Sequence, residues 1–362
     1  MTVVVKIGTS SLTDQDGSIA TDAIERLCAQ VAELRSDGRD VVIVTSGAIE
    51  SGRAVLGLEQ DRARDSVTLQ AVSAVGQTRL MRVYEGALAE QGLVGGQVLL
   101  APLDFFERSQ YLHARGTLGR LLELGVVPIV NENDVIADDA IRFGDNDRIA
   151  ALVANLLKAE VLVLLTDTPG VLTADPRIDQ SASLIQEILE IDRELEAVVT
   201  GPGRRGSGGM ASKLSAARIA AWSGVRTVIA AANRDQVLID AVAAKPGVGT
   251  SVVARDVTLP AKKLWIAFAV RAEGILSVDA GAQRALIERG TSLLAVGIAD
   301  VQGDFAPGDA VEIAGPDGQV FAKGLVAMQA DEVRGAAGQR SADRPGNGPD
   351  EVIHRDDMVI LP

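Results

Sequence analysis

The strongest constraint on the fold is a regular alternation of short apolar runs and amphipathic stretches over residues 1–255. Each apolar run is rich in Val, Leu or Ile and has the length of a buried strand. The predicted strands are 3–7, 40–46, 96–101, 126–131, 161–167 and 227–232. The predicted helices are 21–36, 66–91, 108–124, 146–158 and 210–223. Strands alternating with helices predict an α/β fold, in which helices cover both faces of a mostly parallel sheet.

The alternation stops near residue 250, and the chain of 362 residues is longer than one hydrophobic core usually serves. The run GVGTSVVA at 247–254 and the lysine-containing segment after it have the composition of a linker. We therefore expect a first domain at 1–255, a linker at 256–269 and a second domain at 270–362.

The second domain contains short apolar runs separated by turns that carry Gly and Pro. Its predicted strands are 264–270, 293–302, 310–315 and 319–328, with one short helix, AGAQRALIERG, among them. This pattern predicts a small β-rich barrel or sandwich. The segment SADRPGNGPD at 341–350 is predicted to be a mobile loop.

The amino-acid composition of the chain disfavours several classes of function. The net charge of −14 disfavours nonspecific binding to nucleic acid or to acidic membranes, and an anionic substrate would need a local cluster of positive charge. The single cysteine, Cys28, excludes an intramolecular disulfide and favours a reducing compartment, so we expect a cytoplasmic protein. The N-terminal apolar run is too short for a signal peptide, and apolar runs such as 161–165 are too short to cross a membrane.

Lys6 is unusual because it ends the first predicted strand, VVVKI, and lysine is seldom buried without a partner. One interpretation is an edge strand from which Lys6 reaches water. The other places Lys6 at the carboxyl edge of the sheet, where open α/β folds bind ligands. Other predicted strands also end in polar or small residues, at 45–47, 131–134 and 166–167. If the strands are parallel, these ends share one edge and form a site.

The segment GPGRRGSGGMASK at 201–213 is rich in glycine and precedes a predicted helix. It is either a disordered loop or an anion cradle, in which glycine backbone N–H groups, a helix N-terminus and Lys213 meet a phosphate. Its first glycines match the dinucleotide pattern G-x-G-x-x-G. However, the preceding strand is weak and no acidic residue lies at the expected spacing, so nicotinamide dinucleotide binding is disfavoured.

Two acid–amide groups, Asn131–Asp134 and Asp145–Asp147, flank a short excursion of the chain. Any one carboxylate here is explained by helix capping. Two groups together exceed what capping requires, and they are suited to bind an ammonium, orient lysines or hold Mg²⁺ through water.

The only two histidines, His113 and His354, have no Cys/His ligand pattern around them, and no G-x-S-x-G elbow is present. Zinc chemistry and serine hydrolysis are therefore poorly supported. Lysines, a glycine-rich cradle, carboxylates and small hydroxyls are typical of phosphoryl transfer, which requires positioning and charge neutralisation. A carboxylate acceptor is already ionised and needs no histidine base.

Six segments in this order resemble the glutamate 5-kinases of the amino acid kinase superfamily: VVVKIGTSSL, VTSGAI, VNEND, GDND, LLTDTPGVLTADP and GSGGMASK. The C-terminal segment, with its HRDDM sequence, resembles the PUA domain of many bacterial members. The resemblance implies phosphorylation of the γ-carboxylate of L-glutamate by ATP with Mg²⁺, the first step of proline synthesis.

The resemblance also implies roles for individual residues. Lys6 and Lys213 flank the transferring phosphoryl group, and Asp147 orients them. The residues that hold or adjoin glutamate are Ser46, Asp134, Asn146, Asn131 and Asp145. The residues that hold the nucleotide are Lys6, Thr166, Asp167, Ser207, Gly208, Gly209, Met210, Ala211, Ser212 and Lys213. None of these residues is implied to be a direct metal ligand.

Further expectations are a homo-oligomer, feedback inhibition by proline, and glutamyl phosphate reductase as a downstream partner. Two alternatives stay open: another acidic-amino-acid kinase of the same fold, or an RNA-binding PUA protein. Residues 256–362 contain ten Lys and Arg against sixteen Asp and Glu, a net charge of −6, which makes RNA an unfavourable partner.

Overall fold

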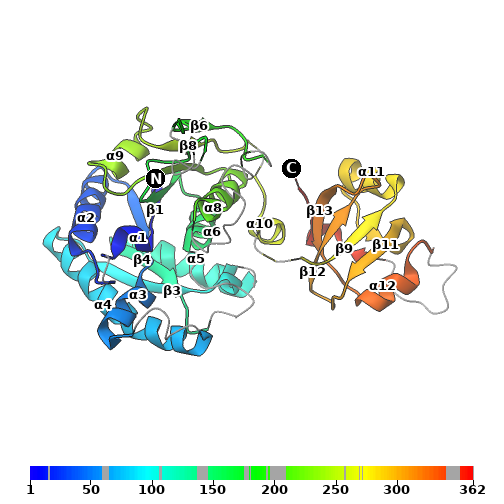
Figure 1. The fold of residues 1–362 in the computed structure, drawn as a ribbon, viewed down its shortest axis with the longest axis horizontal. Coiled ribbons are helices and arrows are strands. Elements are labelled where there is room, and N and C mark those ends of the chain that lie inside the picture. The colour runs from blue at the N-terminus through cyan, green and yellow to red at the C-terminus, as the bar shows by residue number, and fades with distance from the viewer. Residues whose placement is uncertain are drawn as a thin grey trace. The chain divides into compact units, whose positions relative to one another are not determined.

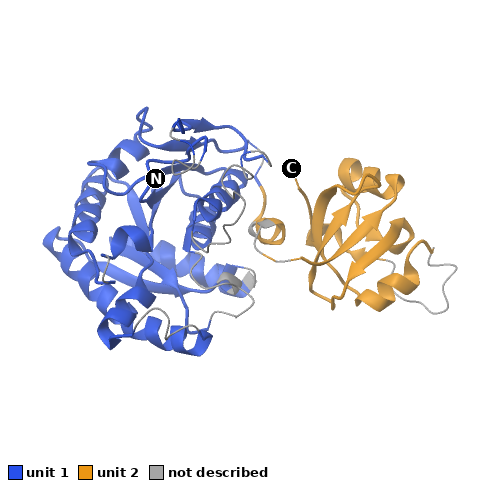
Figure 2. Cartoon of the chain, in the orientation of Figure 1, with its two compact units in different colours: residues 1–258 blue, residues 259–362 orange. Residues whose placement is uncertain are grey.

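The computed structural model describes residues 1–14, 17–58, 65–105, 108–136, 146–174, 179, 181–192, 195, 209–256, 258–268, 270, 272–339 and 351–361. The chain divides into two compact units, Met1–Thr258 and Leu259–Pro362 (Figure 2). Unit 1 contains a large twisted sheet covered by helices, as the blue to green ribbon in Figure 1 shows.

The sheet of unit 1 has eight strands in the order β3-β4-β2-β1-β5-β7-β8-β6. They are β1 Thr2–Ile7, β2 Asp40–Val44, β3 Gly95–Leu100, β4 Val127–Glu132, β5 Val161–Thr166, β6 Glu187–Ile188, β7 Arg226–Ala231 and β8 Thr250–Val252. The neighbours from β3 to β7 pair in parallel, whereas β8 runs antiparallel to β7. The predicted α/β fold with a mostly parallel sheet is thus confirmed, and all six predicted strands of unit 1 are present.

The interpretation of residues 247–254 as part of a linker is wrong, because this run contains strand β8. β8 pairs with β7 on one side and with β6 on the other, which makes it part of the sheet. A strand of only three residues carries too little periodicity to be recognised from sequence.

The predicted helices of unit 1 are all present within one or two residues of their expected ends. They are α2 Thr21–Ser36, α4 Ser66–Glu90, α5 Arg108–Glu123, α6 Asn146–Leu157 and α8 Met210–Trp222. The sequence did not predict the short helices α1 Thr9–Leu12, α3 Ala48–Leu56 and α9 Val237–Val242.

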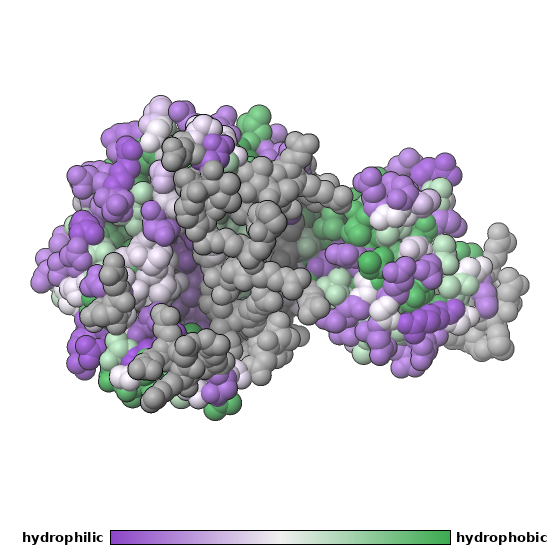
Figure 3. All heavy atoms as spheres, viewed as in Figure 1, coloured by the Kyte–Doolittle hydropathy of each residue, from purple (hydrophilic) through white to green (hydrophobic). Residues whose placement is uncertain are grey.

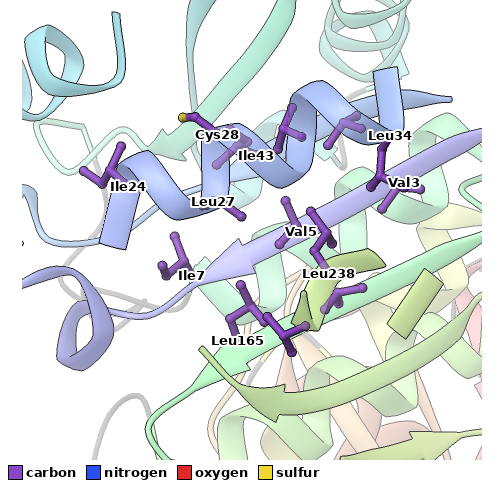
Figure 4. Packing of buried hydrophobic residues seen from close by; sticks show 14 of the residues in the cluster. Val3, Val5, Ile7, Ile24, Leu27, Cys28, Leu34, Ile43, Leu165 and Leu238 are labelled. Atoms are coloured by element: carbon purple, nitrogen blue, oxygen red, sulfur yellow. The ribbon is translucent and has the colours of Figure 1, made fainter. Parts of the chain in front are cut away.

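The core of unit 1 explains why β1 is a nearly continuous valine run. β1 lies between β2 and β5, with α6 in contact with it and residues of α2 in the same core, and Val3, Val4 and Val5 are fully buried. Figure 4 shows Val3 and Val5 facing α2. Cys28 of α2 lies in this same core, where burial raises the pKa of its thiol to about 12.

Unit 2 contains a mixed five-stranded sheet in the order β11-β9-β12-β13-β15 and a two-stranded sheet of β10 and β14. The strands are β9 Ala272–Val278, β10 Leu293–Leu294, β11 Ile298–Gly303, β12 Ala310–Ala314, β13 Val320–Leu325, β14 Glu351–Ile353 and β15 Met358–Ile360. The helices are α10 Ala261–Phe268, α11 Ala280–Arg289 and α12 Ala330–Ala336. The strand-rich character predicted for this part of the chain is confirmed.

One strand prediction in unit 2 is wrong. The run LWIAFAV at 264–270 falls mainly in α10, which packs against β13 and β15. The run is apolar throughout and only seven residues long, and such a run does not distinguish a buried strand from a buried helix. The same helix occupies most of the predicted linker at 256–269, and the predicted mobile loop at 341–350 lies outside the described residues.

Within the described part of the chain, no helix combines the length and the apolar character needed to cross a membrane. In Figure 3, hydrophilic residues cover much of the visible surface of each unit, between smaller apolar areas.

Candidate active site

Four adjacent parallel strands place their carboxyl ends at one edge of the sheet, in the order β4-β2-β1-β5. Polar residues predicted from the sequence lie at these ends and are buried rather than directed into water. They are Lys6 on β1, Ser46 just after β2, Asn131 on β4, Asp134 just after β4, and Thr166 on β5. The carboxyl edge of an open α/β sheet is the usual place for a ligand.

Lys6 is part of an ion-pair cluster with Asp147 and Lys213. Its ammonium lies 2.7 Å from Asp147 Oδ1, and the ammonium of Lys213 lies 3.3 Å from Asp147 Oδ2. The side chains of Lys6, Asp147 and Lys213 are 6%, 1% and 5% exposed. The interpretation of β1 as an edge strand with Lys6 in water is therefore wrong.

The local structure explains how these three side chains meet. Asp147 is in the first turn of α6 and Lys213 is in the first turn of α8, and these two helices pack against each other. Burial by itself would raise the pKa of Asp147, but the charges and hydrogen bonds of Lys6 and Lys213 outweigh it and hold that pKa below the usual value. The cluster thus brings one carboxylate and two lysine side chains together in a buried position.

A second polar cluster surrounds the end of β4. The backbone N–H of Glu132 donates to Asn131 Oδ1 at 2.9 Å and to Asn146 Oδ1 at 3.1 Å. Asp134 follows two residues later and is also buried, which raises the pKa of its carboxyl group. Asn146 immediately precedes Asp147 on α6, so the second cluster adjoins the lysine pair. Asp145 lies outside the described residues.

A third group belongs to the predicted nucleotide site. Thr166 at the end of β5 donates from Oγ1 to Asp167 Oδ1 at 3.1 Å. Gly209 occupies the N-cap of α8 and has no side chain to cap the helix, so the first turn presents backbone donors beside Met210 and Ala211. Ser212 lies in the same turn before Lys213, whereas Ser207 and Gly208 lie outside the described residues.

Some buried polar residues of this region were not predicted from the sequence as site residues. Glu132 is buried at the end of β4, and Ser73 and Gln77 of α4 are buried beside Asp134 and Asn131. The available signal for the α4 residues was a polar side chain on the apolar stripe of a helix. The two histidines lie elsewhere, with His113 exposed on α5 and His354 in unit 2.

The fold and the buried lysine–carboxylate cluster define a phosphoryl-transferring α/β enzyme, and comparisons with known proteins agree. A profile of the amino acid kinase family matches residues 1–231, and a profile of the PUA domain matches residues 274–344. A solved UMP kinase from Bacillus anthracis has a TM-score of 0.50 at 17% identity, covering 71% of this chain and 97% of its own. That likeness concerns the fold alone.

Curated relatives are more similar and cover nearly the whole chain. The glutamate 5-kinase of Pelobacter propionicus is 42% identical over 99% of this chain and 97% of its own length. That of Citrifermentans bemidjiense is 43% identical with the same coverage. The chain therefore belongs to the amino acid kinase family and, within it, to the glutamate 5-kinases.

Proposed function

We propose that the chain transfers the γ-phosphoryl group of ATP to the γ-carboxylate of L-glutamate and forms L-glutamyl 5-phosphate, the first step of proline synthesis. The observation that carries this proposal is the buried cluster of Lys6 and Lys213 around Asp147 at the carboxyl edge of the sheet. The resemblance of the sequence motifs and the names of the relatives support the choice of glutamate.

Lys6 and Lys213 are proposed to neutralise the phosphoryl group during transfer. Phosphoryl transfer depends on positioning and charge stabilisation more than on covalent assistance. At about 4 Å and an effective dielectric constant near 20, one unit charge contributes about 4 kcal/mol. Asp147 is proposed to orient both ammonium groups toward the anionic phosphates.

The polar cluster at the end of β4 is proposed to bind glutamate. Asp134 supplies a carboxylate for the substrate ammonium, and Asn146 supplies an amide beside the lysine pair. Ser46, Asn131 and Asp145 complete this subsite. The attacking γ-carboxylate is ionised at neutral pH, so the reaction requires no general base, and the exposed position of His113 is consistent with that.

The nucleotide is proposed to lie across Thr166-Asp167 and the segment from Ser207 to Lys213. Backbone donors at the start of α8 are suited to phosphate oxygens. Mg²⁺ is proposed to enter with ATP, because it is usually held by substrate phosphates and one or two carboxylates.

The proposal is tested by mixing the purified protein with ATP, Mg²⁺ and L-glutamate in the presence of hydroxylamine, which traps an acyl phosphate as its hydroxamate. Hydroxamate should form with L-glutamate and far less with N-acetylglutamate or aspartate. A preference for either of the other acceptors would assign the chain to another acidic-amino-acid kinase. No product with any acceptor would contradict the phosphotransferase assignment.

Three partner predictions remain part of this proposal: inhibition by proline, assembly into a homo-oligomer, and transfer of the product to glutamyl phosphate reductase. Proline is expected to compete with glutamate, which is tested by measuring the glutamate KM at increasing proline concentrations. A cytoplasmic location is likewise a prediction, based on the single cysteine.

A further inference from the structure

The long helix α4 has an unusual buried face. Ser73, Gln77 and Tyr84 are only 4%, 8% and 0% exposed, and they lie on the same stripe as buried Leu80. Spacings of four, three and four residues place all of these side chains on one face of a helix. A polar side chain at such a position is normally held by a hydrogen bond. The partners of these side chains therefore indicate what the stripe does.

Each polar side chain of the stripe contacts a residue at the end of a strand or just after it. Ser73 donates from Oγ to Asp134 Oδ2 at 2.5 Å. Gln77 accepts at Oε1 from Asn131 Nδ2 at 2.7 Å. Further along the helix, the hydroxyl groups of Tyr84 and Thr45 are 2.9 Å apart. Two of the three contacts thus reach the proposed glutamate subsite.

The contact with Gln77 determines the orientation of the Asn131 amide. Asn131 Oδ1 already accepts from the N–H of Glu132 at 2.9 Å, so its Nδ2 must point the other way and needs an acceptor. Gln77 Oε1 is that acceptor. The same N–H of Glu132 also donates to Asn146 Oδ1 at 3.1 Å. A connected set of hydrogen bonds therefore extends from α4, through the end of β4, to the first residue of α6.

The backbone of α4 is held close to the site by a glycine contact. A Cβ atom at Gly76 would lie 1.8 Å from the carbonyl oxygen of Ala48, the first residue of α3. Only glycine permits this approach, which occurs on the turn of α4 between Ser73 and Gln77. The distance between α4 and the residues after β2 is consequently fixed by backbone packing.

We infer that Ser73 and Gln77 are positioning residues of the acceptor subsite: Ser73 orients the carboxylate of Asp134, and Gln77 orients the amide of Asn131. The inference rests on the proposed function, which assigns Asp134 and Asn131 to glutamate. The hydrogen bond from Ser73 also favours the ionised form of Asp134, against the effect of burial, which raises that pKa. An ionised Asp134 is the form that attracts a substrate ammonium.

The test compares four variants in pairs. Ser73→Ala removes the donor, whereas Ser73→Thr keeps a hydroxyl; Gln77→Met removes the acceptor at similar length, whereas Gln77→Glu keeps an oxygen acceptor. Ser73→Ala and Gln77→Met should each raise the glutamate KM about tenfold, the usual scale for losing a hydrogen bond to a charged or buried group. The ATP KM and kcat should stay within about threefold, and Ser73→Thr and Gln77→Glu should recover at least part of the glutamate KM.

Thr78→Ala is the matched control, because Thr78 is the neighbour of Gln77 on the exposed face of the same helix. An unchanged glutamate KM in both Ser73→Ala and Gln77→Met would overturn the inference. Equal increases in the KM of glutamate and ATP would overturn it as well, because they would indicate a general loss of structure. Thermal unfolding of each variant tests whether it is folded. If a variant at Ser73 or at Gln77 does not fold, the variants at the other position still test the inference.

The unaltered protein is assayed in the same series with glutamate. If it forms no hydroxamate, the proposed function fails. If the unaltered protein forms hydroxamate and the variants behave like Thr78→Ala, only the positioning inference fails.

Discussion

The ammonium of Lys6 lies 2.7 Å from Oδ1 of Asp147, and both side chains are almost completely buried. Since Lys213 approaches the other carboxylate oxygen, Asp147 is the anion for two buried cations. Removing its charge takes an anionic partner away from both lysines in a medium of low dielectric constant, which is costly.

Asp147→Asn should therefore destabilise unit 1 by about 3–5 kcal/mol at neutral pH. The pKa of Asp147 is lowered in the folded protein, so its contribution is present above the unfolded value of about 3.9 and is lost as the pH falls through the folded pKa. Urea unfolding of both proteins at several pH values measures this. The difference in free energy of unfolding should be constant near neutral pH and shrink below about pH 4; an unchanged difference there would contradict the ion-pair explanation.

Lys6→Ala and Lys213→Ala should each lower kcat by about 10²–10³, the cost typical of removing one preorganised group that stabilises charge. The glutamate KM should change little, because the proposed contact is with the phosphoryl group. Lys245→Ala is a suitable control, since Lys245 is exposed and pairs with Asp240 away from the site. Near-normal kcat in a folded Lys6→Ala or Lys213→Ala variant would remove that lysine from the mechanism.

Asp134→Ala and Asn146→Ala should raise the KM of glutamate and leave ATP binding intact, because both residues belong to the cluster at the end of β4. The raised pKa of Asp134 means that its carboxylate becomes protonated at a higher pH than an ordinary aspartate. Steady-state kinetics with each substrate varied in turn measure the effect. The two subsites are assigned the wrong way round if ATP affinity falls and glutamate affinity does not.

Gly76→Ala should destabilise unit 1 by about 3 kcal/mol or more, at the upper end for an overpacked contact, because the clash is with backbone and no side chain can rotate away. Gly86→Ala is the matched control on the same helix. A Cβ atom at Gly86 meets nothing within 4 Å, so this variant should gain about 0.5–1 kcal/mol. Chemical denaturation of both variants gives the comparison, and similar stabilities would contradict the close packing of α3 on α4.

A chain that ends at Thr258 should fold and retain glutamate-dependent phosphoryl transfer, because the proposed catalytic residues all lie in unit 1. The truncation should keep Arg255, whose guanidinium lies 4.1 Å from the centre of the Trp222 ring and pairs with Glu190. Hydroxamate formation by the truncated chain measures the result. A folded but inactive fragment would show that unit 2 is required for the reaction.

The complementary fragment, residues 259–362, is expected to bind generic RNA poorly at physiological salt, because phosphate contacts require clustered cations. A filter-binding assay with the same fragment tests this. Submicromolar affinity would favour the alternative in which the PUA domain makes this an RNA-binding protein.

Long elements with a clear period were predictable from the sequence. The buried strands β1 and β5 are nearly continuous apolar runs, and α2 has its buried residues at helical spacing, so pattern and packing agree. Short elements were not predictable. The two strands β6 and β8 have too few residues to show a period, and α10 lies in a short apolar run that fits a strand as well as a helix.

The candidate site was predicted to the extent that its residues end strands or begin helices. Lys6 and Lys213 were recognised by an unusual charge and a glycine-rich context, and the structure brings both to Asp147. The contribution of α4 could not be predicted, because polar side chains such as Ser73 and Gln77 on the apolar stripe of a helix do not show which residues they contact. Their importance depends on the path of β4, which only the tertiary structure provides.

Cys28 gives unit 1 a built-in chemical probe. It is the only thiol in the chain, it lies on the buried face of α2, and its raised pKa keeps it protonated at neutral pH. A thiolate is the form that reacts with alkylating and disulfide reagents. The native thiol is therefore protected both by its burial and by its protonation. The rate of its modification therefore reports how often the core around α2 opens, and it does so without any engineered label and without interference from unit 2.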